Sequence, residues 1–350
     1  MSLNHAQTEA VAHNKGPCMV LAGPGSGKTL TIAKRIEYLI MKHKVRPEEI
    51  LVITFTKYAA WEMKNRTRSI CGPSSYAVTF GTFHGIYYGI LKWAYRLNQS
   101  NLLSDEEKYR ILREILSGID WDQEPEADEE KDYLQELAIE IGNVKNNCMN
   151  IEEYEPVKYT TEKFRKLYRT YEETKKKYRK IDFEDMLIQC RDLFMKRPDI
   201  LKKWQEKFQY ILVDEFQDVN QAQYDVVRML AAPQDNLFVV GDDDQSVYGF
   251  RGAKPGIMME FMKDYPKARQ ILLDVNYRSS GYIVKGALRV IENNKIRFEK
   301  KIEAFRKPDE TVHVQEVKDP VQEAEYVLER IREYREKGVS YTEMAVLYRT

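Results

Sequence analysis

The stretch that decides the fold is Ala22-Gly23-Pro24-Gly25-Ser26-Gly27-Lys28-Thr29, which directly follows the apolar run Cys18-Met19-Val20-Leu21. After Thr29, apolar residues recur with helical spacing, so the predicted order is a strand, the glycine-rich loop and a helix. In such a loop successive backbone N–H groups face phosphate oxygens, Lys28 reaches the β- and γ-phosphates, and the Thr29 hydroxyl ligates Mg²⁺. Residues 22–29 are therefore predicted to bind a nucleoside triphosphate, although Ala22 stands where glycine is usual.

A second apolar run, residues 208–213, ends in Asp214-Glu215-Phe216-Gln217-Asp218. This is the form of a Walker B strand, in which Asp214 holds Mg²⁺ and Glu215 orients the attacking water or accepts its proton. An acidic turn that caps the next helix is the alternative, which the upstream glycine-rich loop disfavours. The long interval between the two motifs predicts a large insertion between strands of one sheet.

A third apolar run, residues 237–240, leads into residues 241–253, where Gln245 is followed closely by Tyr248, Phe250 and Arg251. An amide can hydrogen-bond to a γ-phosphate, whereas aromatic rings and a guanidinium suit stacked bases and backbone phosphates. This segment is therefore predicted to contact a nucleotide and a nucleic acid together.

Composition sets looser limits on the protein. The 350 residues favour two or more domains, and the 55 basic and 55 acidic residues cancel, so any nucleic-acid contact must come from a local surface. The four cysteines and five histidines show no metal-ligand spacing. No secretion signal or membrane-spanning run is recognisable, so the expected location is cytoplasmic.

In their order along the chain, these motifs resemble those of the superfamily 1 DNA helicases of the UvrD/Rep/PcrA type. Further segments carry the resemblance: Leu3-Asn4 with Gln7, Ile53 to Thr56, Gly81 to His84, Ile181 to Leu187, Asn276 to Ser279, and Val346 to Arg349. The resemblance implies an α/β fold, with a P-loop NTPase (RecA-like) parallel-sheet motor domain that carries a helical insertion and is followed by part of a second RecA-like domain.

The resemblance also implies ATP as the nucleotide and Mg²⁺ as the metal. Gln7 would read the adenine, Tyr277 would stack on it, and Arg278 would act on the γ-phosphate as an arginine finger. The implied ATP-binding set is Gln7, Ala22, Gly23, Pro24, Gly25, Ser26, Gly27, Lys28, Thr29, Tyr277 and Arg278. The implied catalytic set is Lys28, Asp214, Glu215, Gln245 and Arg278, with Thr29 and Asp214 at the metal.

A track for single-stranded DNA is implied as well, consisting of Phe55, Thr56, Thr82, His84, Tyr248, Phe250 and Arg251. Two departures from the family pattern concern these sites: Leu30 stands where such helicases usually have arginine, and Lys57-Tyr58 replaces a frequent Asn-Lys. For Phe55, His84 and Tyr277, ordinary packing is the alternative to a ligand contact.

Two charged segments have alternative interpretations. Asp182 and Asp185 have the spacing of a helix N-cap and the acid three residues later, so we favour capping over a chemical role. The basic run from Lys175 to Lys180 fits either a contact with DNA backbone or an exposed helical face.

Four segments are expected along the chain. Residues 1–87 and 190–274 form the first motor domain, 88–189 form the helical insertion, and 275–350 form part of the second motor domain. Within the last segment we predict strands at 311–317 and 344–348 and a helix at 321–335. The family's motifs V and VI are not found, so the chain is expected to be an N-terminal portion that does not unwind duplex DNA by itself.

The expected function is that of an ATP-dependent DNA helicase or translocase, moving 3′-to-5′ on single-stranded DNA in DNA repair, replication or recombination. Its expected partners are single-stranded DNA and duplex/single-strand junctions, with no membrane. Three alternatives stay open: a nuclease-coupled motor similar to AddA/RecB, a nucleotide-gated DNA-binding module without motor activity, and a P-loop small-molecule kinase. The aromatic and arginine residues of 248–251 disfavour the kinase.

Overall fold

A computed structural model describes residues 3–119, 130–247, 253–254, 256–307 and 311–348. The chain divides into two compact units, Met1–Lys307 and Pro308–Thr350. Nucleotide-site residues predicted from the sequence all lie in the first unit. Tyr248, Phe250 and Arg251, predicted to contact DNA, lie outside the described residues.

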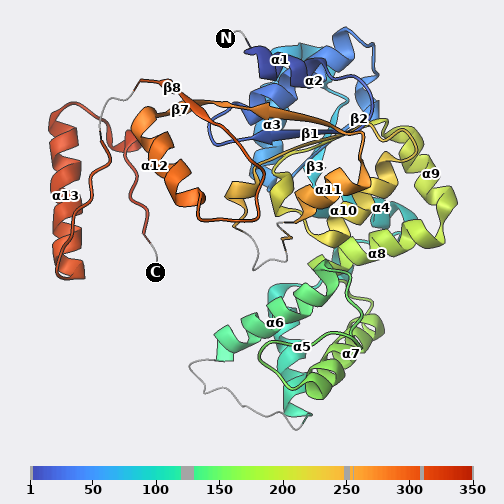
Figure 1. Ribbon diagram of the computed structural model, residues 1–350. Coiled ribbons are helices and arrows are strands. Elements are labelled where there is room, and N and C mark those ends of the chain that lie inside the picture. Colours follow the sequence, from blue (N-terminus) through green and yellow to red (C-terminus); the bar gives the residue numbers. More distant parts are fainter. Residues whose placement is uncertain (1–2, 120–129, 248–252, 255, 308–310, 349–350) are drawn as a thin grey trace. The chain divides into compact units, whose positions relative to one another are not determined.

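The centre of the first unit is a six-stranded parallel sheet in the order β3-β2-β4-β5-β1-β6 (Figure 1). Four of its strands are buried along their whole length, which explains why they read as continuous apolar runs rather than as alternating patterns. The strands are β1 (Cys18–Ala22), β2 (Ile50–Thr54), β3 (Thr79–Thr82), β4 (Tyr210–Val213), β5 (Leu237–Gly241) and β6 (Arg269–Leu273).

Helices cover both faces of this sheet, and alternate side chains along each strand supply the two cores. Met19 and Leu21 of β1 pack on one face, whereas Val20 and Ala22 pack on the other. The first face is covered by α4 (Phe83–Tyr95), α8 (Phe183–Lys196), α9 (Pro198–Lys207), α10 (Gln221–Ala231) and α11 (Ile257–Asp264). The second is covered by α1 (His5–Ala12), α2 (Lys28–Met41) and α3 (Lys57–Cys71). The predicted α/β fold is confirmed.

The insertion between β3 and β4 has a helical core of its own. It contains α5 (Asp105–Ser117), α6 (Glu130–Asn146) and α7 (Thr161–Lys177), whose apolar stripes meet around Leu112, Leu137 and Phe164. The helical character expected of the insertion is confirmed, because apolar side chains three and four residues apart fall on one face of each helix.

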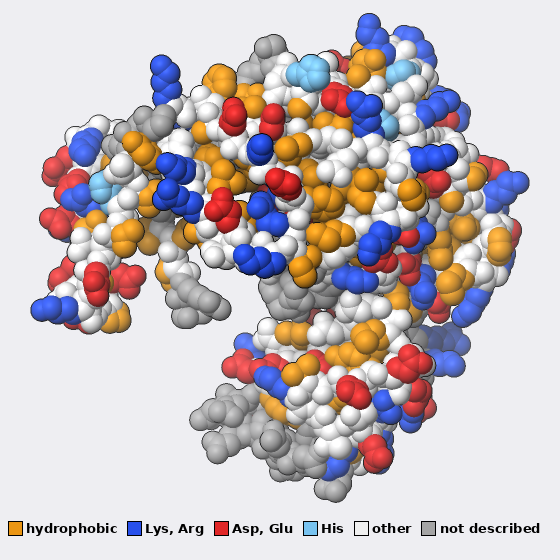
Figure 2. Space-filling view, in the orientation of Figure 1, with side chains coloured by type: hydrophobic (Ala, Val, Ile, Leu, Met, Phe, Trp, Pro, Cys, Tyr) orange, Lys and Arg blue, Asp and Glu red, His pale blue; other side chains and the backbone are white. Residues whose placement is uncertain are grey.

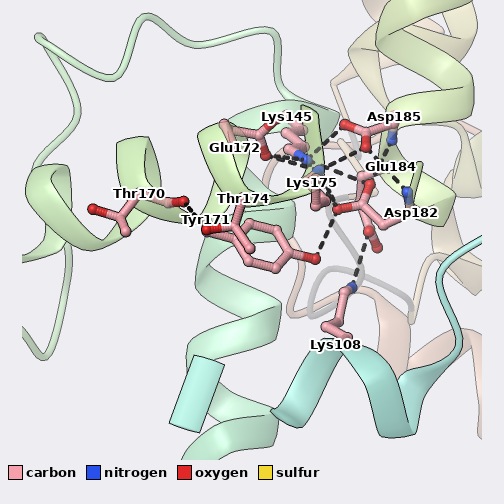
Figure 3. Close-up of polar contacts among 10 residues, drawn as sticks. All are labelled: Lys108, Lys145, Thr170, Tyr171, Glu172, Thr174, Lys175, Asp182, Glu184 and Asp185. Carbon is pink, nitrogen blue, oxygen red and sulfur yellow. Dashed lines mark hydrogen bonds and ion pairs between the residues drawn. The ribbon is translucent and has the colours of Figure 1, made fainter. Parts of the chain in front are cut away.

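The first turn of α8 anchors the insertion to the sheet (Figure 3). Asp182 is the N-cap: its Oδ1 accepts from the Asp185 N–H at 2.8 Å, and Asp185 Oδ2 accepts from the Asp182 N–H at 3.0 Å. The predicted capping box is therefore confirmed. The same carboxylates also bind two ammonium groups, from Lys145 of α6 and Lys175 of α7.

These charges form what we call the α8 charge cluster, made of Lys145, Glu172, Lys175, Asp182 and Asp185. Lys175 Nζ lies 2.7 Å from Asp182 Oδ2 and 2.6 Å from Asp185 Oδ2, and Lys145 Nζ lies 2.7 Å from Asp185 Oδ1. Burial opposes ionisation of Asp182, but Lys145 and Lys175 outweigh it and hold the pKa of that carboxyl well below its usual range.

Lys175 corrects the sequence-based interpretation of the basic run. Its exposed fraction is 1%, so Lys175 is neither a DNA-facing residue nor part of an exposed helical face. The neighbouring Lys176 and Lys177 are exposed. A lysine among like charges looks solvent-facing in sequence, but here it turns inward because two buried aspartates need counter-charges.

Residues 275–307 add a small β-α-β unit, consisting of β7 (Val275–Ser280), α12 (Gly281–Ile291) and β8 (Glu303–Arg306). The two strands are parallel, with Val275 opposite Glu303 and Asn276 opposite Ala304. The helix between them is the crossover that parallel pairing requires.

The second unit contains one long helix, α13 (Pro320–Glu336), which confirms the helix predicted there. The strands predicted at 311–317 and 344–348 are wrong, since the described residues of both segments have no strand conformation. An extended apolar segment becomes a strand only when a neighbour completes its hydrogen bonds, and no strand pairs with these segments in the described part of the chain. No helix in that part is long and apolar enough to cross a membrane.

We expect Lys175→Met to lower the free energy of unfolding by about 3–5 kcal/mol, because it removes a counter-charge from two buried carboxylates. Urea denaturation followed by circular dichroism measures this change. Lys176→Met, the same substitution at the exposed neighbour, should change the free energy by no more than about 0.5 kcal/mol. Equal effects of the two substitutions would show that the α8 charge cluster contributes nothing to stability.

Candidate functional site

The candidate site lies where the parallel strands end. Loops that follow parallel strands leave from one edge of the sheet, and ligands of open α/β sheets bind at that edge. Here β4, β5 and β1 are adjacent, so residues 214–218, 242–245 and 22–29 emerge side by side. Segments far apart in the sequence thus form one site.

The glycine-rich loop has the backbone conformation that its sequence predicts. Gly25 and Gly27 have φ of +68° and +86°, in the left-handed region that side chains rarely enter. Gly27 caps α2, so the N-terminus of that helix and its unpaired N–H groups begin at Lys28 and Thr29. A Cβ on Gly25 would lie 2.7 Å from Arg278 Cβ, so glycine also allows β7 to approach the loop closely.

A cavity of about 410 Å³ opens at this loop, within the size range of small-molecule sites. It brings together most of the predicted nucleotide contacts, from four separate segments of the chain, and α3 supplies a fifth. Two lining residues of α3, Glu62 and Arg66, were missed as contacts; their i, i+4 spacing was visible in the sequence but is common on exposed helices. The lining consists of Pro24, Gly25, Ser26, Gly27, Lys28, Thr29, Glu62, Arg66, Glu215, Gln245, Tyr277 and Arg278.

Four predicted residues do not line the cavity: Gln7, Ala22, Gly23 and Asp214. All four are buried. The Gln7 amide holds the loop, because its Nε2 donates to the Ser26 carbonyl at 2.9 Å and its Oε1 accepts from the N–H of Asn4 at 3.1 Å. Its contact with adenine stays a prediction.

The strand β7 is fastened directly to the glycine-rich loop. Asn276 Nδ2 donates to the Pro24 carbonyl at 2.7 Å, and the Tyr277 N–H donates to the Gly25 carbonyl at 2.9 Å. The Tyr277 hydroxyl accepts from Asn4 Nδ2 at 2.9 Å. These contacts hold Tyr277 and Arg278 at the cavity. Sequence reasoning quoted Asn4 and Asn276 only as members of motifs, because the partners that place them here, Tyr277 and Pro24, lie more than 250 residues away in the sequence.

Three carboxyl groups follow β4 at the cavity, those of Asp214, Glu215 and Asp218, and Glu215 lines it. Glu215 Oε2 lies 3.5 Å from Lys28 Nζ, and the Glu215 N–H donates to Asp214 Oδ1 at 3.0 Å. Glu215 itself has φ of +51°, a conformation that is uncommon for a non-glycine residue. Burial, followed by the charge of Glu215, raises the pKa of Asp214 to about 7, and the same two causes raise that of Asp218 to about 6.

The donor set fits a divalent cation. The charge of Glu215 raises the pKa of both Asp214 and Asp218, and the charge of Lys28 acts in the opposite direction on both. Asp218 Oδ1 is buried and has no hydrogen-bond partner. An excess of buried carboxylate oxygen beside a phosphate-binding loop is the environment in which Mg²⁺ binds together with phosphates.

Gln217 connects two of the predicted segments. Its Nε2 donates to Glu215 Oε2 at 2.9 Å, and its Oε1 accepts from the Asp242 N–H at 3.0 Å. Asp242 Oδ2 in turn accepts from Gln245 Nε2 at 2.6 Å. The side chain expected to assist water attack and the amide expected to contact the γ-phosphate are therefore linked through two intermediate residues.

A second, larger cleft of about 580 Å³ lies between the sheet domain and the insertion. Phe55 and His84, two residues predicted at the DNA track, line this cleft, and the His84 ring packs edge-on against Phe183 with centroids 5.7 Å apart. Burial lowers the pKa of His84, so the ring is neutral at pH 7. The lining is Phe55, Phe83, His84, Asp105, Lys108, Tyr109, Gln135, Ala138, Ile139, Gly142, Asn143, Asn146, Phe183, Glu184, Asp218, Asn220 and Gln223.

Thr56 and Thr82, also predicted at the DNA track, do not line this cleft. Each is an N-cap instead: Thr56 Oγ1 accepts from the Ala59 N–H at 3.0 Å, and Thr82 Oγ1 accepts from the Gly85 N–H at 3.1 Å.

The side chain of Phe183 is 53% exposed and lines the cleft, but sequence analysis named this residue only as part of a motif.

Surface charge does not single out another site on the face drawn in Figure 2. Basic and acidic side chains of the described residues are interspersed there, in keeping with the equal numbers of the two kinds in the sequence. A contact with nucleic acid on this face therefore depends on individual side chains rather than on a broad basic surface.

Comparisons with known proteins agree with this arrangement. Residues 3–266 match the family described as UvrD/REP helicase N-terminal domain, and residues 271–350 match the UvrD-like helicase C-terminal domain. The ATP-dependent DNA helicase PcrA of Staphylococcus aureus is 36% identical over 355 residues, which cover 99% of this chain and 48% of PcrA. PcrA of Staphylococcus epidermidis is 35% identical over 356 residues, covering 100% of this chain and 48% of that protein.

A Bacillus subtilis protein, YjcD, which carries the provisional designation of ATP-dependent DNA helicase, is 39% identical over 361 residues. That match covers 100% of this chain and 46% of YjcD, so the chain spans about half the length of the curated relatives it matches. Because the N-terminal family match extends over most of the chain and includes the strands whose ends form the cavity, this chain belongs to the UvrD/REP helicase family.

Proposed function

We propose that this protein is an ATP-dependent DNA helicase or translocase that moves 3′-to-5′ on single-stranded DNA. The observation that carries the proposal is the position of residues 215–223 between two cavities. Glu215 lines the 410 Å³ cavity at the glycine-rich loop, whereas Asp218, Asn220 and Gln223 line the 580 Å³ cleft. One short segment therefore lines both the cavity proposed for ATP and the cleft proposed for DNA.

In this proposal ATP occupies the cavity at the glycine-rich loop. The N–H groups at the start of α2, with Lys28, bind the phosphates, and Tyr277 and Arg278 of β7 approach from the opposite side. Glu215 accepts a proton from the attacking water, a role helped by the Gln217 amide that orients its carboxylate. Arg278 stabilises charge on the transferred phosphoryl group.

Thr29 and Asp214 are the residues proposed to hold Mg²⁺, which when bound neutralises phosphate charge during transfer. Asp214 is buried and has a raised pKa, so a nearby divalent cation would favour its ionised form. Thr29 lines the cavity directly at the helix N-terminus.

Single-stranded DNA is proposed to occupy the 580 Å³ cleft. Phe55, His84 and Phe183 offer ring faces or edges to bases, and Lys108 and Asn143 of the insertion offer donors to phosphates or base edges. Thr56, Thr82, Tyr248, Phe250 and Arg251 remain proposed contacts of single-stranded DNA. DNA in the cleft would contact residues within 218–223 and, through them, would affect the position of Glu215.

We expect Glu215→Gln to reduce DNA-stimulated ATP hydrolysis by about two orders of magnitude or more while ATP still binds, because the shape is kept and the proton acceptor is lost. Lys28→Ala should weaken binding itself. Steady-state hydrolysis and equilibrium titration with a fluorescent ATP analogue separate the two effects. Glu206→Gln, the same change at an exposed position, is the control; near-normal turnover of Glu215→Gln would eliminate Glu215 as the base.

We expect Phe183→Ala to weaken binding of single-stranded DNA by about 1–3 kcal/mol, which is roughly a 5- to 150-fold rise in Kd, if the ring stacks on a base. Fluorescence anisotropy with a labelled oligonucleotide measures Kd. Tyr76→Ala is a matched control, because Tyr76 is 61% exposed but does not line the cleft. An unchanged Kd for Phe183→Ala would remove this cleft from the DNA track.

The direction of movement is tested with two duplex substrates that carry a 3′ or a 5′ single-stranded tail. In the presence of ATP and Mg²⁺ the natural protein should unwind the 3′-tailed duplex and leave the 5′-tailed one intact. Preference for the 5′ tail would reverse the proposed polarity. ATP-dependent changes in DNA affinity without unwinding or translocation would instead identify a nucleotide-gated binding module.

A further inference from the structure

Three consecutive aspartates follow β5: Asp242, Asp243 and Asp244, here called the aspartate triplet. Asp242 is completely buried, and the side chains of Asp243 and Asp244 are 6% and 12% exposed. Three adjacent carboxylates removed from water repel one another and require a counter-charge. No neighbour within residues 241–247 supplies one, so it has to come from elsewhere in the fold.

Lys300 supplies that charge from the segment between α12 and β8. Its side chain is fully buried, and its Nζ lies 2.5 Å from Asp242 Oδ1, 2.6 Å from Asp243 Oδ1 and 2.7 Å from Asp244 Oδ2. One ammonium group therefore uses its three donors on three carboxylates. Burial opposes the charged form, but Asp242 and its neighbours outweigh it and raise the pKa of Lys300.

Two further contacts come from the same segment. Arg297 donates to Asp244 through Nε at 2.8 Å and Nη2 at 2.6 Å, and the Phe298 N–H donates to Asp243 Oδ2 at 2.8 Å. The bidentate geometry fixes the orientation of the Asp244 carboxylate as well as its distance. Residues 297–300 thus hold each member of the aspartate triplet.

The aspartate triplet is joined to the nucleotide cavity by two routes. Asp242 Oδ2 accepts from Gln245, whose side chain lines the cavity, and the Asp242 N–H donates to Gln217, which contacts Glu215. Lys300 binds the other oxygen of the same Asp242 carboxylate. A shift of that carboxylate would move the Gln245 amide, because the two are directly hydrogen-bonded.

We propose that Lys300 is a positioning residue for ATP hydrolysis: by holding Asp242, it fixes the Gln245 amide at the cavity and ties it to the β-α-β unit whose first strand carries Tyr277 and Arg278. The inference rests on the proposed function, since it concerns the same ATP site. Lys300 touches neither nucleotide nor water in this assignment and acts only through Asp242. Small displacements of such groups reduce turnover more than binding, because alignment matters most in the transition state.

Lys300→Met tests the proposal. We expect kcat for DNA-stimulated ATP hydrolysis to fall about 10- to 100-fold, with the KM for ATP changing less than about threefold. Lys301→Met is the matched control, because Lys301 is the adjacent lysine and is exposed. Wild-type kcat in a folded Lys300→Met variant overturns the inference.

A double-mutant cycle with Gln245→Ala separates positioning from general stability. If Lys300 acts through Gln245, Lys300→Met should reduce kcat by less than about threefold in the Gln245→Ala background, well short of its effect alone. Full additivity overturns the inference but leaves the proposed ATPase intact. The absence of DNA-stimulated hydrolysis in the wild-type protein would instead overturn the proposed function, and the inference with it.

A charge-balanced variant keeps the test valid if Lys300→Met alone does not fold. Lys300→Met combined with Asp243→Asn removes one positive and one negative charge, so folding should recover while kcat stays low, because Asp242 still lacks its partner. Arg297→Gln, which leaves Lys300 in place, should lower kcat less than this double variant. Wild-type kcat in the charge-balanced variant would show that Lys300 only neutralises the aspartate triplet and does not position Gln245, which would overturn the proposal.

Discussion

The rest of the structure depends on the parallel pairing of β1 with β5 and of β5 with β4. The register sets Leu21 opposite Gly241 and Val213 opposite Val239, so these strands end at nearly the same level. The glycine-rich loop, the acidic segment and the aspartate triplet leave the sheet together for that reason. The insertion does not disturb this arrangement, because it enters after β3 and returns before β4 at positions separate from the β4-β5-β1 ladder.

Buried ion pairs then fix the positions of segments that strand pairing in the sheet does not determine. In the α8 charge cluster, lysines from α6 and α7 hold the first turn of α8; at the aspartate triplet, Lys300 and Arg297 hold the segment after β5. Apolar packing tolerates small sliding, whereas a buried carboxylate requires its donors at defined distances and angles. Each cluster therefore fixes the relative position of segments that are distant in sequence.

The two cavities share a wall formed by residues 215–223. Glu215 is on the nucleotide side and has a left-handed backbone conformation, after which the chain turns into a short helix and then α10 on the cleft side. Tyr224 and Phe216 pack this segment into the core, with their rings edge-on to each other. In the proposed function, this short packed segment would couple occupancy of one cavity to occupancy of the other.

The sequence by itself determined the features that local physics controls: the buried strands, the strand, loop and helix at residues 18–29 and beyond, the helical insertion and the capping box at Asp182. The tertiary structure alone decided that Lys175 turns inward, that Gln7 holds the glycine-rich loop, that Asn276 fastens β7 to it, and that Lys300 neutralises the aspartate triplet. It also decided that residues 311–317 and 344–348 are not strands. Periodicity, capping and backbone torsion act within a few residues. A counter-charge or a pairing strand, in contrast, can come from anywhere in the chain, so only the folded structure determines which residue or strand is the partner.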